Sequence, residues 1–165
     1  MITLHAMTDS DFAWLLGESS ARADGLTQCG GGIGPVEVTA MMRDVTKGVA
    51  ATTDRAVAWM IADGDTVVGM TSFTKQGGDG RYEIGYGVAP AHEGRGVMTR
   101  AIAALLPILR ADGHSGLTAE TSVDNPGSQR VLDKNGFVRT GTRDDPEDGA
   151  LITWAIDLTS NGRPA

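Results

Sequence analysis

Two hydrophobic periods divide the chain into expected strands and expected helices. Apolar residues that alternate with polar ones, or that form short apolar runs, predict strands over 2–6, 56–62, 66–74, 81–89, 117–123, 137–141 and 150–158. Apolar residues spaced by three and four predict helices over about 9–19, 38–47, 97–111 and 126–135. This order predicts an α/β (α+β) fold with a mixed, mostly antiparallel sheet of about seven strands flanked by about four helices.

Capping and turn residues support these boundaries. Thr8-Asp9-Ser10 predicts a cap for the first helix, and Asp63-Gly64-Asp65 predicts a hairpin turn. Asp124 or Asn125 should cap the last helix, and Gly136 should end it.

The two middle helices should each bury one apolar face. These faces consist of Val38, Met41, Met42 and Val45 in one helix, and of Val97, Met98, Ala101, Ile102, Leu105 and Ile108 in the other. Pro107 should kink the second of these helices or split off its last turn. The glycine-rich stretch 26–36 is either a slack connection or a mobile lip over a site.

Length and charge indicate one globular domain. A chain of 165 residues, 41% of them hydrophobic, can bury a sizeable core, so we expect one domain over 1–160 and a short tail over 161–165. The formal net charge of −7 argues against a nucleic-acid partner. It suits either solubility or the attraction of amines and basic peptides.

Three further classes of protein are not indicated. The apolar runs fall short of the ~20 residues of a membrane span, and the first residues lack the pattern of a signal peptide. Cys29 is the only cysteine and the histidines are scattered, so neither a disulfide nor a metal site is expected. A cytoplasmic location is the simplest inference.

The loop Gly94-Arg95-Gly96, between the strand over 81–89 and the next helix, needs a physical reason. Glycine costs about 0.5–1 kcal/mol relative to alanine within regular structure. The first amides of a helix lack partners within it, so glycines here would let a phosphate approach the backbone. A tight turn would favour the same glycines. The loop matches neither G-x-x-x-x-G-K-S/T nor G-x-G-x-x-G, which excludes the P-loop and the dinucleotide fingerprint.

Two strings in the second half of the chain carry a resemblance to a known family. Residues 82–102 read YEIGYGVAPAHEGRGVMTRAI, and residues 122–137 read SVDNPGSQRVLDKNGF. Together they resemble the GNAT superfamily of acetyl-coenzyme A-dependent N-acetyltransferases, most closely the branch of ribosomal-protein N-terminal acetyltransferases. The resemblance implies a GNAT-like acyl-CoA N-acyltransferase fold over nearly the whole chain.

The same resemblance implies how coenzyme A would be held. The family loop Gln/Arg-x-x-Gly-x-Gly/Ala aligns with residues 93–98, which include Gly94. The amides that would hold the diphosphate are those of Arg95, Gly96, Val97, Met98 and Thr99. Glu93 adds a negative charge to this loop, and Met98 is bulkier than the usual residue and would narrow the approach. Pantetheine would lie beside Val88 and Ala89, with the Val88 amide donating to the oxyanion.

The group that assists the departing thiolate differs from the usual one. Many relatives carry a tyrosine on the last helix, where this chain has Leu132. The ribosomal-protein branch has a serine in an Asn-x-x-Ser string, which implies Ser128 near the sulfur. Ser128 could equally serve the first turn of its helix. Asn125 either positions pantetheine or a water molecule, or only caps the helix.

A base is needed because most amines are protonated near pH 7 and only the neutral form attacks. Alternation along the strand places Glu83 on the same face as Gly85 and Gly87, which leave open space beside its carboxylate. Glu83 is therefore the first candidate base, and the alternative is a structural ion pair or hydrogen bond with a helix. Glu120, on the next strand, is the second candidate.

The resemblance implies an enzyme that moves an acetyl group from acetyl-CoA to a primary amine by direct attack through a tetrahedral intermediate. The acceptor would be a protein N-terminus or a small molecule. The alternative is a weak or inactive acyl-CoA-binding sensor of the same fold, which Glu93, Met98 and the missing tyrosine favour. An unrelated α/β protein would leave the 122–137 string unexplained. The acceptor pocket is expected between the first two helices and the loops beside the last strands, in a monomer or homodimer.

Overall fold

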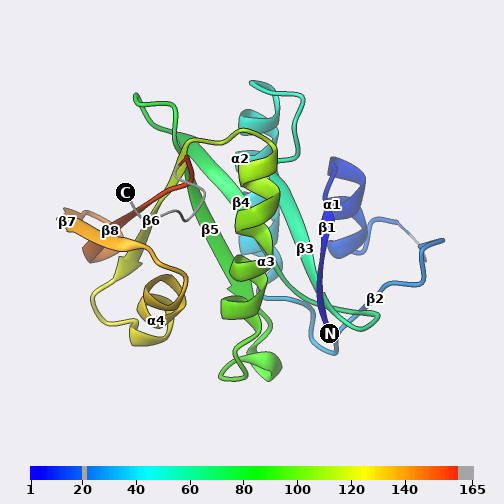
Figure 1. Cartoon of the computed structure of the whole chain (residues 1–165). Helices are drawn as coiled ribbons and strands as arrows, with labels where there is room; N and C mark the ends of the chain where they lie inside the picture. The colour runs from blue at the N-terminus through cyan, green and yellow to red at the C-terminus, as the bar shows by residue number, and fades with distance from the viewer. Residues whose placement is uncertain (20–21, 160–165) are drawn as a thin grey trace.

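Strands and helices follow one another in nearly the predicted order (Figure 1). The computed structural model describes residues 1–19 and 22–159, so the tail expected over 161–165 lies outside the described residues. The elements are β1 (Ile2–Ala6), α1 (Asp9–Leu15), β2 (Thr27–Gln28), α2 (Val36–Ala50), β3 (Ala58–Asp63), β4 (Thr66–Gln76), β5 (Tyr82–Val88), a 3₁₀ helix (Pro90–His92), α3 (Val97–Ala111), β6 (Gly116–Ser122), α4 (Pro126–Lys134), β7 (Val138–Asp145) and β8 (Gly149–Asp157).

The strands form one eight-stranded sheet in the order β1-β3-β4-β5-β6-β8-β7, with β2 paired to β4 off this path. The pairs β5–β6 and β2–β4 are parallel, and the other pairs are antiparallel. The predicted mixed, mostly antiparallel sheet is therefore confirmed. β2 is an addition, and it ties part of the glycine-rich stretch to the sheet because the Thr27 N–H donates to the Asp65 carbonyl at 2.9 Å.

Two apolar cores lie on opposite faces of this sheet. Trp59 and Ile61 of β3 pack in the core that contains α3 and Leu132 of α4, whereas Met60 between them packs with α1. This division follows from the alternation of side chains along a strand. Figure 1 shows α3 in front of the sheet and α2 behind it.

The predicted turn and cap signals are confirmed, including the hairpin turn at Asp63-Gly64-Asp65 between the antiparallel strands β3 and β4. Thr8 caps α1, Asn125 caps α4, and Gly136 follows the end of α4 with φ 85°. The first helix, however, ends at Leu15 and not near Ser19. Gly17, which lies just beyond the helix, has φ 77°, a left-handed conformation that commonly ends helices.

The predicted buried face of α2 is wrong in part. Val38 is 47% exposed and Met41 is 55% exposed, whereas Thr39, Thr46 and Val49 are buried. The buried residues follow helical spacing, but two of them are threonines, which a search for apolar residues does not count. The helix also extends beyond the predicted range at both ends.

α3 continues through Pro107 to Ala111, so of the two predicted outcomes, a kink or a split-off last turn, the second is wrong. Proline deprives the carbonyl of Ala103 of its partner, but both residues are exposed, so water can replace the lost bond. Ile108 is 39% exposed and lies outside the core, contrary to the prediction. Leu109 is buried in its place, because it continues the spacing of four from Leu105.

Candidate active site

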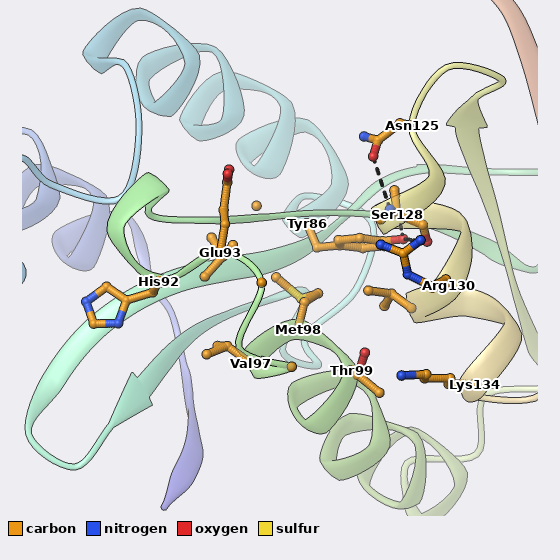
Figure 2. A pocket seen from close by; sticks show the side chains of 16 residues that line it. Tyr86, His92, Glu93, Val97, Met98, Thr99, Asn125, Ser128, Arg130 and Lys134 are labelled. Carbon is orange, nitrogen blue, oxygen red and sulfur yellow. Dashed lines mark hydrogen bonds between the residues drawn. The ribbon is translucent and has the colours of Figure 1, made fainter.

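β5 and β6 separate along their length, and this separation opens the site. Their parallel pairing covers only Tyr82–Ile84 and Leu117–Ala119, after which β5 continues to Val88 and β6 to Ser122. A cavity of about 580 Å³ lies beside the end of β5, within the usual size range of small-molecule sites. Its walls come from β5, the loop before α3, the first turn of α3, and α4 (Figure 2).

Most of the residues predicted to hold coenzyme A line this cavity. They are Val88, Glu93, Gly94, Gly96, Val97, Met98, Thr99, Asn125 and Ser128. Ala89 differs from the expectation, because it is buried and its N–H already donates to the Val68 carbonyl at 2.7 Å. Arg95 is exposed, and its carbonyl accepts from Arg100 Nη2 at 3.2 Å. Glu83 does not line the cavity, because strand alternation directs it to the face of β5 opposite to Tyr86.

The conformation of the two loop glycines fits both explanations, a tight turn and an approach of a phosphate to the backbone. Gly94 has φ 73° and Gly96 has φ 72°, so the turn itself requires a residue that tolerates the left-handed region. A Cβ added at either position would meet open space. The turn therefore accounts for the glycines, and it also leaves the backbone open to a ligand.

The first turn of α3 presents its amides to the cavity. Gly96 is the N-cap, and glycine has no side chain that could accept from the amides of Val97, Met98 and Thr99. Met98 is only 6% exposed and packs in the core, so it forms part of the cavity wall. Asn135 fixes this turn against α4, since its Nδ2 donates to the carbonyls of Thr99 at 3.1 Å and Val131 at 2.9 Å.

Two cations that the sequence reasoning missed line the cavity from α4. Arg130 and Lys134 extend from α4 into the cavity, opposite the first turn of α3 (Figure 2). Their spacing of four places them on one helix face, and this signal was available in the sequence. Glu93 is exposed, and its carboxylate points away from the first turn of α3. The positive charges therefore face the amides more directly than Glu93 does.

Ser128 is held at the cavity by two different elements. Its N–H donates to Asn125 Oδ1 at 3.1 Å, which is the cap of α4. Its Oγ lies 2.9 Å from the hydroxyl oxygen of Tyr86 on β5, a residue that sequence reasoning had not placed in the site. Burial raises the pKa of the Tyr86 hydroxyl above its ordinary value, and the hydrogen bond with Ser128 opposes part of that rise.

The direction of the Val88 amide follows from its neighbour. The Ala89 N–H points toward β4, where it donates to Val68. Successive N–H groups of a strand point to opposite sides, so the Val88 N–H is directed toward the separation between β5 and β6. An amide there is a suitable donor to an oxyanion.

The two candidate bases lie on the opposite face of the sheet from Ser128. Glu83 Oε1 accepts from Thr74 Oγ1 at 2.8 Å, and Lys75 Nζ is 3.5 Å from its other oxygen, so its partners come from a strand and not from a helix. Glu120 forms a two-pronged ion pair with Arg143. Hydrogen bonds from Arg143 lower the pKa of Glu120, which weakens this carboxylate as a base.

Residues 1–19 and 22–159 lack two features of other protein classes. No helix among these residues is long and apolar enough to cross a membrane. The same part of the chain holds no group of three or more His, Cys, Asp or Glu side chains arranged to bind a metal ion.

Known proteins resemble this chain in sequence. The family model described as an acetyltransferase (GNAT) domain matches residues 2–138. The ribosomal-protein-serine acetyltransferase of Escherichia coli (strain K12) is 32% identical over 88 residues, which cover 52% of this chain and 49% of that protein. The chain thus matches about half the length of that curated relative.

Solved structures share the fold over nearly the whole chain. A ribosomal L7/L12 alpha-N-protein acetyltransferase, solved in complex with coenzyme A, has a TM-score of 0.68 and 18% identity, with 94% of this chain and 93% of that chain covered. A spermidine N-acetyltransferase chimera derived partly from Vibrio cholerae has a TM-score of 0.70 and 15% identity, with 98% and 99% covered.

Proposed function

Because this chain belongs to the GNAT family of acetyltransferases, we propose that it transfers the acetyl group of acetyl-coenzyme A to a primary amine, either a protein N-terminus or a small molecule. One observation carries the proposal. The first turn of α3 begins at a glycine cap and opens into the same cavity as Ser128. That arrangement offers an anion-binding backbone and a hydroxyl group to one ligand.

The charged and amide groups that line the cavity suit coenzyme A. The amides of Val97, Met98 and Thr99 would bind the diphosphate, helped by the positive end of the α3 dipole. Arg130 and Lys134 would add positive charge from the opposite wall. The pantetheine arm would follow the free edge of β5, which brings the thioester to the Val88 amide.

One residue can then be assigned to each chemical step of the transfer. Val88 N–H donates to the carbonyl oxygen as the amine forms its C–N bond, and one such donor is worth about 3–4 kcal/mol. Glu83 accepts the amine proton directly or through one water molecule. Ser128 donates a hydrogen bond to the sulfur as the C–S bond breaks. Because Glu83 and Ser128 lie on opposite faces of β5, the amine would approach from the face opposite to coenzyme A.

A thiol-release assay tests this function. Acetyl-coenzyme A is offered with peptides that begin with serine or alanine, and with spermidine or an aminoglycoside. Release with at least one of these amines is expected. Binding of coenzyme A by calorimetry without any release would support the alternative, an acyl-CoA sensor, and absence of binding would overturn both.

Substitution of the base gives the sharper test. Glu83→Gln should lower kcat about a hundredfold, the usual contribution of a general base, with little change in coenzyme A affinity. Asp54→Asn is the matched control, because Asp54 is an exposed carboxylate in the connection between α2 and β3. An unchanged kcat in Glu83→Gln would remove Glu83 from the reaction.

A further inference from the structure

We propose that Tyr86 is a positioning residue that orients the Ser128 hydroxyl toward the sulfur of coenzyme A, and this inference rests on the proposed acetyl transfer. Tyr86 lines the cavity with Ser128. It lies two residues before Val88 on β5, so both side chains are on the same face of the strand. Its ring extends from β5 to α4, as Figure 2 shows. One side chain thereby links the strand that would bind the oxyanion to the helix that would face the thiolate.

Two oxygens of Ser128 lie within hydrogen-bond distance of the single Tyr86 hydroxyl. The distance from the Tyr86 oxygen is 2.9 Å to Ser128 Oγ and 3.1 Å to the Ser128 carbonyl oxygen. The backbone of Ser128 is fixed separately, through its N–H and Asn125. The direction of the Ser128 hydroxyl hydrogen is left open by these contacts, because either hydroxyl can be the donor.

The hydrogen of the Tyr86 hydroxyl determines that direction, because it can be donated either to the Ser128 carbonyl or to Ser128 Oγ. When Tyr86 donates to the carbonyl, Ser128 can donate to the phenol oxygen, and its hydrogen is turned away from the cavity. When Tyr86 donates to Ser128 Oγ, the serine hydrogen is free to point at the sulfur. A developing thiolate favours the second arrangement, since hydrogen bonds to a charged acceptor are about twice as strong as neutral ones.

Tyr86 acts through Ser128 and keeps its own proton. Its hydroxyl is removed from bulk water, so forming a phenolate there is unfavourable. Leu132, at the position where many relatives carry tyrosine, is fully buried in the core. The hydroxyl pair from β5 and α4 would thus take the role that a single tyrosine on α4 has in those relatives.

A double-mutant cycle tests this inference. Tyr86→Phe keeps the ring and removes the hydroxyl, and it should lower kcat about tenfold while the affinity for coenzyme A stays within about twofold. Ser128→Ala should lower kcat at least as much. In the Ser128→Ala background, Tyr86→Phe should have no further effect on kcat. Tyr82→Phe is the matched control, because Tyr82 lies on the same strand and stacks on Phe73.

Three results would overturn the inference. The first is an unchanged kcat in Tyr86→Phe. The second is a kcat in the double variant that falls by the product of the two single losses, which would mean that the two side chains act independently. The third is a raised KM for acetyl-coenzyme A with kcat unchanged, which would assign Tyr86 to binding. If the wild-type protein releases no thiol with any amine, the proposed function itself fails. If the wild type turns over and the cycle shows no coupling, only the role of Tyr86 fails.

Discussion

The amino termini of α1 and α3 are completed in opposite ways. At α1, Thr8 is the cap, the Asp11 carboxylate accepts the Thr8 N–H at 2.7 Å, and Asp9 adds a second carboxylate to the first turn. At α3, the cap is Gly96 and the first turn reads Val-Met-Thr-Arg. The positive end of each helix dipole attracts negative charge. The chain supplies that charge itself at α1, whereas the α3 end is left available to an outside anion.

Placing a carboxylate at the α3 end should have the largest effect. Gly94→Asp puts a charge beside the diphosphate site, in open space and at a φ of 73° that aspartate and asparagine tolerate better than most residues. At ~5 Å and an effective dielectric constant of about 20, the repulsion is about 3 kcal/mol. Calorimetry should then show coenzyme A binding weakened roughly a hundredfold. Gly94→Asn is the uncharged control, and an equal loss in both variants would break the comparison.

Removal of the cations that face the α3 end should have a smaller effect. Arg130→Gln and Lys134→Gln should each weaken coenzyme A binding about three- to tenfold at low salt, and less at high salt, because salt screens exposed charges. Lys47→Gln, on the exposed side of α2, should leave the affinity unchanged. If the affinity for coenzyme A did not depend on salt in any variant, electrostatic binding of the diphosphate at the amino terminus of α3 would be contradicted.

Loss of the cap at α1 should affect stability and not binding. Thr8→Ala removes the side chain that caps α1, so the free energy of unfolding should fall by about 1 kcal/mol in a urea titration. The affinity for coenzyme A should stay as in the wild type. Weaker binding in this variant would show that the two helix ends are coupled and not independent.

The contribution of Asp9 at the α1 end to acid unfolding is the smallest effect expected. A hydrogen bond from Arg43 lowers the pKa of Asp9 to about 2. A lowered pKa contributes stability that is present above the ordinary value of 3.8 and is lost as pH falls through about 2. Acid unfolding of Asp9→Asn should therefore differ from wild type above pH 3.8 and converge with it near pH 2. A difference that persists at still lower pH would contradict this assignment.

Features set by neighbouring residues could be predicted from the sequence, and features set by packing could not. The caps at Thr8 and Asn125 depend on bonds within one turn, so local residue types suffice to find them. The buried face of α2 depends on which of its faces meets β4. Thr39 and Thr46 are buried there, although their polarity gives no such signal.

The candidate site divides in the same way. The glycine loop and Ser128 lie in two continuous strings, so both could be named in advance. Tyr86 and Ser128 are separated by 42 residues, and their contact depends on how far α4 approaches the end of β5. The ion pair between Glu120 and Arg143 joins residues that are 23 positions apart on two strands, so the lowered pKa of Glu120 could not be foreseen.

Backbone amide NMR during titration with coenzyme A tests the central claim most directly. The account predicts that the amide signals of Val97, Met98 and Thr99 shift strongly and saturate together, while those of Asp11 and Phe12 in the first turn of α1 stay unchanged. Shifts of equal size at both helix ends would contradict it. So would unshifted signals of the α3 amides at a coenzyme A concentration that saturates the protein.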